Sequence, residues 1–459
     1  MSLWTAQEII AATGGTASGD FDVNGVAFDS REIEPGHLFV AMPGTAHDGH
    51  DFIEKAFANG AVAALVSRDV DVPHIKVEDV PAALEALAKA ARARLSEEAV
   101  VVGVTGSVGK TSTKEALRAA FERTTGGKAH ASVKSYNNHT GVPLSLARMP
   151  RETKAAVLEM GMNHAGEIAA LTRLVRPHIA LVTAIAPAHI ENLGSIEAIA
   201  DAKAEIFEGL EPGGVAIVPE ESEQRDRLVA AAKQKTDRVL TFGGKEGDAS
   251  ILYAAAAPQG GSQVTARLPG RTITFTIAMP GDHWLSNALA VLTTVGEARG
   301  DVARAGLALA EMAGLKGRGQ RLDVDIEGGQ VLIIDESYNA NPASMAATLK
   351  MLGDVEAKRH VAVLGAMKEL GEEGPKLHAG LAGPVADAKI ALAILVGEEM
   401  APLADALSLT PTEVIHVNDA DAAGYALLTA IRPGDAILVK ASNSLRLGKV
   451  VDQVAGGGA

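Results

Sequence analysis

The chain has 459 residues, of which 47% are hydrophobic, so it is too long for a single hydrophobic core and we expect two to four domains. Its formal net charge of −15 and its aromatic content of 3% argue against nucleic-acid binding, which needs basic grooves and rings for stacking. The absence of cysteine excludes disulfides, thiolate nucleophiles and cysteine-bound metals.

Residues 1–97 are predicted to form a small α/β domain. An alanine-rich helical pattern over residues 80–95 ends it, and Glu97 and Glu98 precede an apolar run typical of a new strand. The first residues contain Glu8 and no basic segment, and no apolar run in the sequence reaches the roughly 18 residues of a membrane span. We therefore expect a cytoplasmic protein.

The most informative segment is VVVGVTGSVGKTST at residues 100–113, where an apolar strand pattern leads through a glycine-containing turn into a helical pattern. Gly106 and Gly109 allow successive backbone N–H groups to point inward, as in a phosphate-binding loop. Lys110 supplies a positive charge, and the hydroxyl of Thr111 is a typical Mg²⁺ ligand. A helix beginning near Ser112 would add its positive N-terminal end. The segment predicts binding of ATP or GTP, although a glycine turn without a ligand is the plainer alternative.

Residues 98–314 are predicted to be a nucleotide-binding domain built on a parallel sheet. Apolar runs at residues 155–160, 179–185 and 215–219 alternate with helical patterns, which is typical of parallel α/β folds. Residues 241–277 differ from this pattern because their short alternating strands surround a turn at residues 258–261. We expect an antiparallel extension there.

Residues 315–459 are predicted to form a third domain after a glycine-rich, basic hinge at residues 315–321. Apolar runs alternate again with helical patterns, which favours a doubly wound sheet. These runs lie at residues 331–334, 361–364, 390–396, 414–417 and 436–439.

Polar residues that follow apolar strands are the next candidates for a site. Glu159 ends one such strand and could offer a carboxylate to Mg²⁺, or it could be a solvated turn residue. His189 follows another strand, where a structural histidine is the alternative. Lys203 has the spacing of an ordinary lysine on a helix surface. The polar loop at residues 335–342 lies where parallel sheets bind ligands, and an Asx-rich turn is its alternative.

Taken together, a set of short segments that follow one another in a specific order along nearly the whole chain resembles the Mur ligases of bacterial cell-wall synthesis. The segments are DSR at 29–31, PG at 35–36, LFVA at 38–41, DGHDFI at 48–53, TGSVGKTS at 105–112, NN at 137–138, GVPL at 141–144, EMGMNHAGEI at 159–168, AH at 188–189, AKAEIF at 202–207, SYNANP at 337–342 and LVK at 438–440. The SYNANP loop resembles the members that add a dipeptide, because members that add single amino acids typically carry a DYAHxP-like loop there.

The resemblance implies an α/β protein of three domains and a set of site residues. The domains are an N-terminal UDP-sugar-binding α/β domain (1–97), a central P-loop ATP-binding domain with a parallel sheet (98–314) and a C-terminal Rossmann-like doubly wound domain (315–459). Catalytic roles are implied for Lys110, His189 and a carbamylated Lys203. The other implied roles are ATP contacts by Thr105, Gly106, Ser107, Gly109, Lys110, Thr111, Ser112, Asn287, Arg321 and Asp335, substrate contacts by Ser30, Arg31, Asn138, Asn163, His164, Asn339 and Asn341, and metal ligands from Thr111, Glu159, His189 and Lys203.

The activity implied by the resemblance is an ATP- and Mg²⁺-dependent ligation of D-alanyl-D-alanine to UDP-N-acetylmuramoyl-tripeptide through an acyl phosphate, by a monomer. One alternative is a GTPase-type switch, which would need an NKxD-like motif that the sequence lacks. A second alternative is a relative such as folylpolyglutamate synthetase or a Mur ligase that adds one amino acid. The N-terminal domain and the SYNANP loop disfavour both of these relatives.

Overall fold

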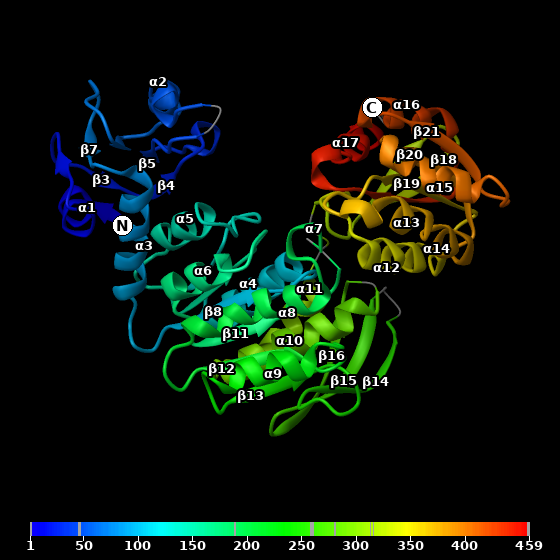
Figure 1. Cartoon of the computed structure of the whole chain (residues 1–459), viewed down its shortest axis with the longest axis horizontal. Helices are drawn as coiled ribbons and strands as arrows, with labels where there is room; N and C mark the ends of the chain where they lie inside the picture. Colours follow the sequence, from blue (N-terminus) through cyan, green and yellow to red (C-terminus); the bar gives the residue numbers. More distant parts are fainter. Residues whose placement is uncertain are drawn as a thin grey trace.

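The structure is a computed structural model, and it describes residues 2–44, 47–187, 190–257, 261–279, 281–312, 314 and 316–456. Three α/β bodies follow one another along the chain, each with its own mainly parallel sheet. Figure 1 shows the N-terminal body in blue, the central body in cyan and green, and the C-terminal body in yellow to red. The predicted fold class is therefore confirmed.

The N-terminal body is a five-stranded sheet in the order β2-β7-β6-β5-β4, in which only β2 runs antiparallel to its neighbour. Its longest helix, α3, begins after Asp79, whose side chain accepts a hydrogen bond from the N–H of Ala82 and caps the helix. Leu84 and Leu87 of this helix pack in one hydrophobic cluster with Val142 and Leu146 of the central body. The elements are β1 (Trp4–Thr5), α1 (Ala6–Thr13), β2 (Thr16–Ala17), β3 (Asp22–Val23), β4 (Gly25–Ala27), β5 (His37–Val40), α2 (Ile53–Ala58), β6 (Ala63–Val66), β7 (His74–Lys76) and α3 (Val80–Ala93).

The central body is a six-stranded parallel sheet in the order β13-β12-β11-β8-β10-β9. Helices cover both faces: α4, α10 and α11 pack on one, and α6, α8 and α9 pack on the other. Burial on both sides explains why the strands read as continuous apolar runs. The elements are β8 (Val100–Thr105), α4 (Lys110–Thr125), β9 (Ala129–Ala131), α5 (Gly141–Ala147), β10 (Ala155–Glu159), α6 (Glu167–Val175), β11 (Ile179–Val182), α7 (Ile190–Leu193), α8 (Ile196–Ala204), β12 (Val215–Pro219), α9 (Arg225–Lys233), β13 (Val239–Phe242), α10 (His283–Glu297) and α11 (Val302–Glu311).

A separate antiparallel sheet lies between β13 and α10, and it contains β14 (Ser250–Ala256), β15 (Ser262–Leu268) and β16 (Arg271–Ile277). The predicted antiparallel extension is confirmed, but its expected start at residue 241 is wrong. Residues 241 and 242 belong to β13, which pairs in parallel with β12. Of the predicted turn at 258–261, residues 258–260 lie outside the described residues.

The C-terminal body is a six-stranded sheet in the order β17-β18-β22-β19-β20-β21. Every predicted apolar run is a strand of this sheet, and the sequence analysis missed β17, which pairs antiparallel with β18 at the edge. The elements are β17 (Gln320–Ile326), β18 (Gly329–Glu336), α12 (Pro342–Gly353), β19 (Arg359–Gly365), α13 (Gly374–Ala379), α14 (Ala382–Asp387), β20 (Ile390–Val396), α15 (Ala401–Leu407), β21 (Glu413–Val417), α16 (Ala420–Ala430), β22 (Asp435–Lys440) and α17 (Gly448–Gly456).

Candidate functional site

A tight glycine loop connects β8 to α4 at the carboxyl end of the central sheet. Gly106 has a φ of +145°, and a Cβ there would lie 2.1 Å from Oγ1 of Thr183. Gly109 has a φ of +83°, in the left-handed region that favours glycine. Thr183 Oγ1 donates to the carbonyl of Val108 at 2.6 Å and holds the loop against β11. The helix begins at Lys110, two residues earlier than the sequence analysis expected, so its first N–H groups lie directly at the loop.

The side chain of Lys110 folds back into this loop. Its Nζ donates to the carbonyl oxygen of Gly106 at 2.7 Å. Burial lowers the pKa of this ammonium, and the carboxylate of Glu159 opposes that shift. Ser107 contributes a buried Oγ that has no hydrogen-bond partner. A cation and an unpaired hydroxyl beside the first N–H groups of α4 fit a phosphate group.

Thr111 and Glu159 meet at the edge of the loop. Thr111 Oγ1 donates to Oε2 of Glu159 at 2.8 Å, and Asn137 Nδ2 donates to Oε1 at 2.8 Å. Glu159 is 1% exposed, so the alternative of a solvated turn residue is wrong. Thr111 Oγ1 also lies 3.2 Å from Oγ of Ser135. The pair offers oxygen atoms of the kind that Mg²⁺ binds, although no group of three His, Asp or Glu side chains gathers in the described part of the chain.

Lys203, on α8, is completely buried, and its Nζ has no hydrogen-bond partner among the described residues. The spacing-based prediction of a lysine on the helix surface is therefore wrong. Burial lowers the pKa of this amine well below its ordinary value, and the positive charge of Lys110 lowers it further. A buried unpaired ammonium is costly, so the surroundings of Lys203 favour the neutral amine. His189, the other predicted ligand near this point, lies outside the described residues.

A cavity of about 610 Å³ extends from the phosphate loop to the C-terminal body. Both bodies contribute to its wall, so the predicted central and C-terminal contact residues meet in one place. The predicted site residues that line it are Ser107, Gly109, Lys110, Thr111, Ser112, Asn138, Glu159, Asn163, Asn287, Asn339 and Asn341.

Arg321 and Asp335, both predicted to contact nucleotide, do not line the cavity. Arg321 is exposed on β17 and is not part of the cavity wall. Asp335 is fully buried, and its carboxylate accepts hydrogen bonds from the N–H of Gly317 and from the N–H and Oγ of Ser337, which makes it a support of the wall. The arginine in the wall is Arg318, whose guanidinium lies 4.1 Å from the ring centre of Tyr338. The sequence analysis missed it, although the flanking glycines, both at positive φ, mark a turn there.

The loop before α12 presents Asn339 to the cavity. Asn341 lines it as well, and its side chain accepts a hydrogen bond from the N–H of Ser344 and caps α12, so part of the Asx-turn alternative is correct. Lys440, at the end of β22, is buried, and its Nζ donates to the carbonyl oxygen of Asn339 at 2.9 Å. Lys440 lines the cavity and was not among the predicted site residues.

The remaining predicted site residues lie away from the cavity. Ser30 is buried in the N-terminal body, and Arg31 forms an ion pair with Asp29 at 2.6 Å. His164 is exposed, and its Nδ1 lies 3.2 Å from Oε1 of Glu167. Thr105 is buried behind the loop, where its Oγ1 donates to the carbonyl of Met160.

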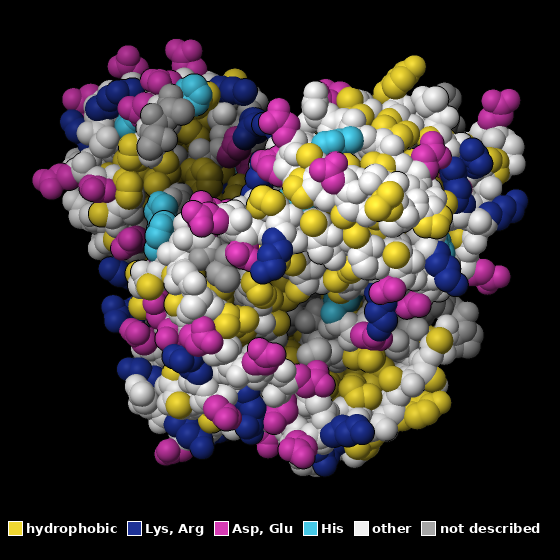
Figure 2. All heavy atoms as spheres, turned by 45° about the vertical axis from the view of Figure 1, so that its right-hand side comes forward, with side chains coloured by type: hydrophobic (Ala, Val, Ile, Leu, Met, Phe, Trp, Pro, Cys, Tyr) yellow, Lys and Arg dark blue, Asp and Glu magenta, His cyan; other side chains and the backbone are white. Residues whose placement is uncertain are grey.

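The molecular surface carries charges of both signs. Figure 2 shows acidic and basic side chains interspersed over the face that it presents. Cations that could bind anionic ligands are instead placed locally, at Lys110, Arg318 and Lys440 in the cavity wall. Among the described residues, no helix has the length and hydropathy that a membrane crossing requires.

Comparison with known protein families finds matches along most of the chain. The catalytic domain of the Mur ligase family matches residues 22–95, the Mur ligase middle domain matches residues 104–295, and the Mur ligase glutamate ligase domain matches residues 317–443. These three segments follow the three α/β bodies of the structure in order.

Individual relatives match over nearly their full length. The UDP-N-acetylmuramoyl-tripeptide--D-alanyl-D-alanine ligase of Rickettsia prowazekii is 32% identical over 455 residues, which cover 98% of this chain and 99% of that protein. The ligase of the same name from Escherichia coli is 35% identical over 440 residues, which cover 94% of each chain.

Solved structures agree with these matches. The crystal structure I of MurF from Acinetobacter baumannii has a TM-score of 0.84 and 28% identity and covers 99% of both chains. The structure of the MurF ligase from Thermotoga maritima in complex with ADP has a TM-score of 0.75 and 27% identity and covers 95% of this chain and 97% of that one.

Proposed function

The chain belongs to the Mur ligase family, and we propose that it is the ATP-dependent, ADP-forming ligase that adds D-alanyl-D-alanine to UDP-N-acetylmuramoyl-tripeptide in peptidoglycan synthesis. The observation that carries the proposal is the shared cavity, in which the phosphate loop of the central sheet faces the loop before α12. The relatives of that name from Rickettsia prowazekii and Escherichia coli align with 98% and 94% of the chain. A parallel assay of dipeptide and single amino acids tests the proposal.

The reaction needs an activated carboxylate, because a carboxylate is a poor electrophile. Transfer of the γ-phosphoryl group of ATP to the tripeptide carboxylate gives an acyl phosphate and ADP. Lys110 and the N–H groups at the start of α4 neutralise charge on the phosphates during this transfer. The dipeptide amine then attacks the acyl carbon, and phosphate leaves. An α-amino pKa of about 7.7–8.0 leaves much of that amine neutral at physiological pH, so the reaction requires no strongly perturbed base.

Thr111 and Glu159 fit a magnesium site, because a hydroxyl and a buried carboxylate lie in contact beside the loop. When bound there, Mg²⁺ would neutralise charge on the transferred phosphoryl group. Asn137 and Ser135 hold the two ligands in place. We also propose His189 as a ligand of a second metal ion.

Lys203 fits the carbamylation that the family resemblance implies. Its neutral amine would attack CO₂ and release a proton, which converts a buried, unpaired amine into an anion that can bind metal. In water only about one lysine in a thousand is neutral near pH 7.4. Burial lowers the pKa of Lys203 and so enlarges that reactive fraction.

The other predicted roles follow the three bodies. We propose that residues 1–97 bind the UDP-sugar, with Ser30 and Arg31 as contacts, that residues 98–314 bind ATP, and that residues 315–459 complete the site. Asn287 and Arg318 are the proposed nucleotide contacts, and Arg318 replaces Arg321 in that role because it lines the cavity. The proposed substrate contacts are Asn138, Asn163, His164, Asn339 and Asn341. We propose that the protein acts as a monomer in the cytoplasm, as the family resemblance implies.

A further inference from the structure

Residues 132–138 lie in the connection from β9 to α5, and we call them the linking loop. Within this loop, neighbouring side chains contact different parts of the molecule. Lys134 and Tyr136 contact the N-terminal body, whereas Ser135 and Asn137 contact residues at the phosphate loop. The loop is therefore the point where the N-terminal body and the nucleotide cavity meet.

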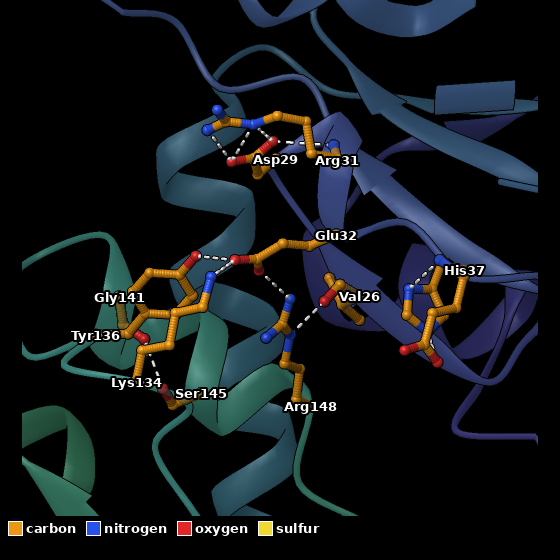
Figure 3. Close-up of polar contacts among 11 residues, drawn as sticks. Val26, Asp29, Arg31, Glu32, His37, Lys134, Tyr136, Gly141, Ser145 and Arg148 are labelled. Carbon is orange, nitrogen blue, oxygen red and sulfur yellow. Dashed lines mark hydrogen bonds and ion pairs between the residues drawn. The ribbon is translucent and has the colours of Figure 1, made fainter. Parts of the chain in front are cut away.

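On the N-terminal side the loop binds one carboxylate, that of Glu32. Lys134 Nζ lies 2.5 Å from Oε1 of Glu32, and the hydroxyl of Tyr136 donates to the same oxygen at 2.7 Å. Arg148 Nη2 lies 3.5 Å from Oε2 and comes from the residue that follows α5. Figure 3 shows the three side chains converging on Glu32 from the central body. The ring of Tyr136 also packs against Phe28, with 5.4 Å between ring centres.

On the cavity side the loop holds the proposed magnesium ligands. Asn137 Nδ2 donates to one oxygen of Glu159, and Thr111 donates to the other, so the carboxylate is fixed in rotation. Ser135 Oγ lies 3.2 Å from Oγ1 of Thr111 and 3.4 Å from Nη2 of Arg318, which belongs to the C-terminal body. Movement of this loop would release Glu159 on one side and Thr111 on the other.

The loop is held in a conformation that its sequence does not favour. Lys134 has a φ of +51°, in the left-handed region that side chains with a Cβ rarely adopt. Lys114, a completely buried residue of α4, donates from Nζ to the carbonyl oxygens of Ser132 and Lys134, each at 2.7 Å. Glu32 holds the side chain of the same strained residue. Backbone strain of this kind persists only where the surroundings impose it.

We propose that Glu32 and Lys114 are positioning residues that hold the linking loop so that Ser135 and Asn137 orient Thr111 and Glu159 for Mg²⁺. Docking of the N-terminal body through Glu32 thereby sets the affinity of the cavity for the magnesium form of the nucleotide. This inference rests on the proposed function, because it takes Thr111 and Glu159 as the metal ligands. Glu32 itself lies outside the cavity wall.

The test measures ADP binding by the full chain with a fluorescent ADP analogue, in excess Mg²⁺ and in EDTA. Glu32→Gln should weaken binding in Mg²⁺ about tenfold, the effect of one charge-assisted hydrogen bond, and leave binding in EDTA unchanged. Glu34→Gln is the matched control, since the side chain of Glu34 is 80% exposed and lies 3.9 Å from Nε2 of His37, outside hydrogen-bond distance. If Glu32→Gln only destabilised the fold, it would weaken ADP binding equally in Mg²⁺ and in EDTA, and that result would overturn the proposal.

A second pair of variants tests the strained backbone. Lys134→Gly and Lys134→Ala both remove the ion pair with Glu32, but only glycine adopts a positive φ without strain. We expect Lys134→Ala to bind the magnesium form several-fold more weakly than Lys134→Gly. Equal affinities, both unchanged from the unsubstituted chain, would contradict the role of the loop. If the unsubstituted chain bound no ADP in either condition, the proposed function itself would be wrong.

Discussion

Thr111 Oγ1 and Glu159 Oε2 lie 2.8 Å apart, and this contact joins the first turn of α4 to the last residue of β10. In the chain, β9 and α5 lie between these two elements, which are brought together because β8 and β10 are neighbours in the parallel sheet. The carboxyl ends of such neighbours share one edge, where ligands bind. The contact therefore places a hydroxyl and a buried carboxylate beside the glycine loop, at the edge of the sheet where ligands bind.

The first prediction concerns the hydroxyl of Thr111. Thr111→Val preserves the shape of the side chain but removes the oxygen, so the Mg²⁺ concentration needed for half-maximal activity should rise roughly 10–100-fold. Thr111→Ser keeps the oxygen and is the matched control. Initial rates measured across a Mg²⁺ titration at saturating ATP would give both values. Equal Mg²⁺ requirements for the valine and serine variants would remove Thr111 from the metal site.

The buried amine of Lys203 predicts a pH-dependent gain in stability when it is replaced. The pKa of Lys203 is lowered in the folded state, so the folded chain binds its proton less well than the unfolded chain does. This difference lowers the free energy of unfolding. The loss is fully present below the lowered pKa of the folded state and disappears as the pH rises toward about 10.4, the pKa of a lysine in the unfolded chain. Lys203→Met should therefore increase the free energy of unfolding at pH 7. The melting temperature should rise by about 2–4 °C for each kcal/mol of that increase, and the rise should be smaller at pH 9.

The melting curves for Lys203→Met should be recorded without substrate, Mg²⁺ or dissolved CO₂, so that the lysine stays unmodified. Lys233→Met is a suitable control, because Lys233 lies in the last turn of α9 on another helix of the same body. A Lys203 variant less stable than the unsubstituted chain at pH 7 would contradict the cost assigned to the buried amine.

A chemical rescue tests the carbamate itself. Lys203→Ala should lose activity by about 100-fold or more, the usual scale for removal of a group that stabilises transferred charge. Formate or acetate should restore part of the rate, because a small carboxylate can occupy the place of the carbamate. Phosphate release measured across a formate titration would reveal the recovery. A fully active Lys203→Ala variant would make the lysine purely structural.

The phosphate loop could be predicted from the sequence because its signals are local: glycines at the turn, then Lys110 and Thr111 at the start of a helix. The burial of Lys203 could not. Its spacing on α8 is typical of an exposed position, and its surroundings come from segments far away in the chain. Helical periodicity cannot detect a polar residue that the fold buries.

The edge strand β17 had a signal that the analysis did not use. Leu322, Val324 and Ile326 alternate with charged residues, which is the period of a half-exposed strand. The family resemblance assigned the nucleotide contact to Arg321, at the end of the predicted hinge, and Arg318 was not considered. The pairing of β17 with β18 places Arg321 on the exposed strand and Arg318 in the preceding turn, beside Tyr338.

The two arginines make a matched pair for the fourth prediction. Arg318→Ala removes the guanidinium that lies over Tyr338 and near Ser135, so the KM for ATP should rise about tenfold. Arg321→Ala should leave the KM within twofold, since the exposed residue does not line the cavity. Steady-state kinetics with varied ATP would separate the two. The reverse order of effects would restore the original prediction for Arg321.

The amine substrate provides the decisive prediction for the proposed function. Phosphate release should require ATP, Mg²⁺, UDP-N-acetylmuramoyl-tripeptide and D-alanyl-D-alanine together, and single amino acids should fail. A site built for a dipeptide forms hydrogen bonds with the internal amide of the ligand and with its carboxylate, which lies one residue further from the amine than in a single amino acid. Each buried polar group that a shorter ligand leaves unpaired costs about 1–3 kcal/mol, so two such losses give roughly hundredfold discrimination or more. Product masses from parallel assays with D-alanine, L-lysine, meso-diaminopimelate and D-glutamate would measure it. Ligation of any of these as efficiently as the dipeptide would overturn the assignment drawn from residues 337–342 while leaving the ligase chemistry intact.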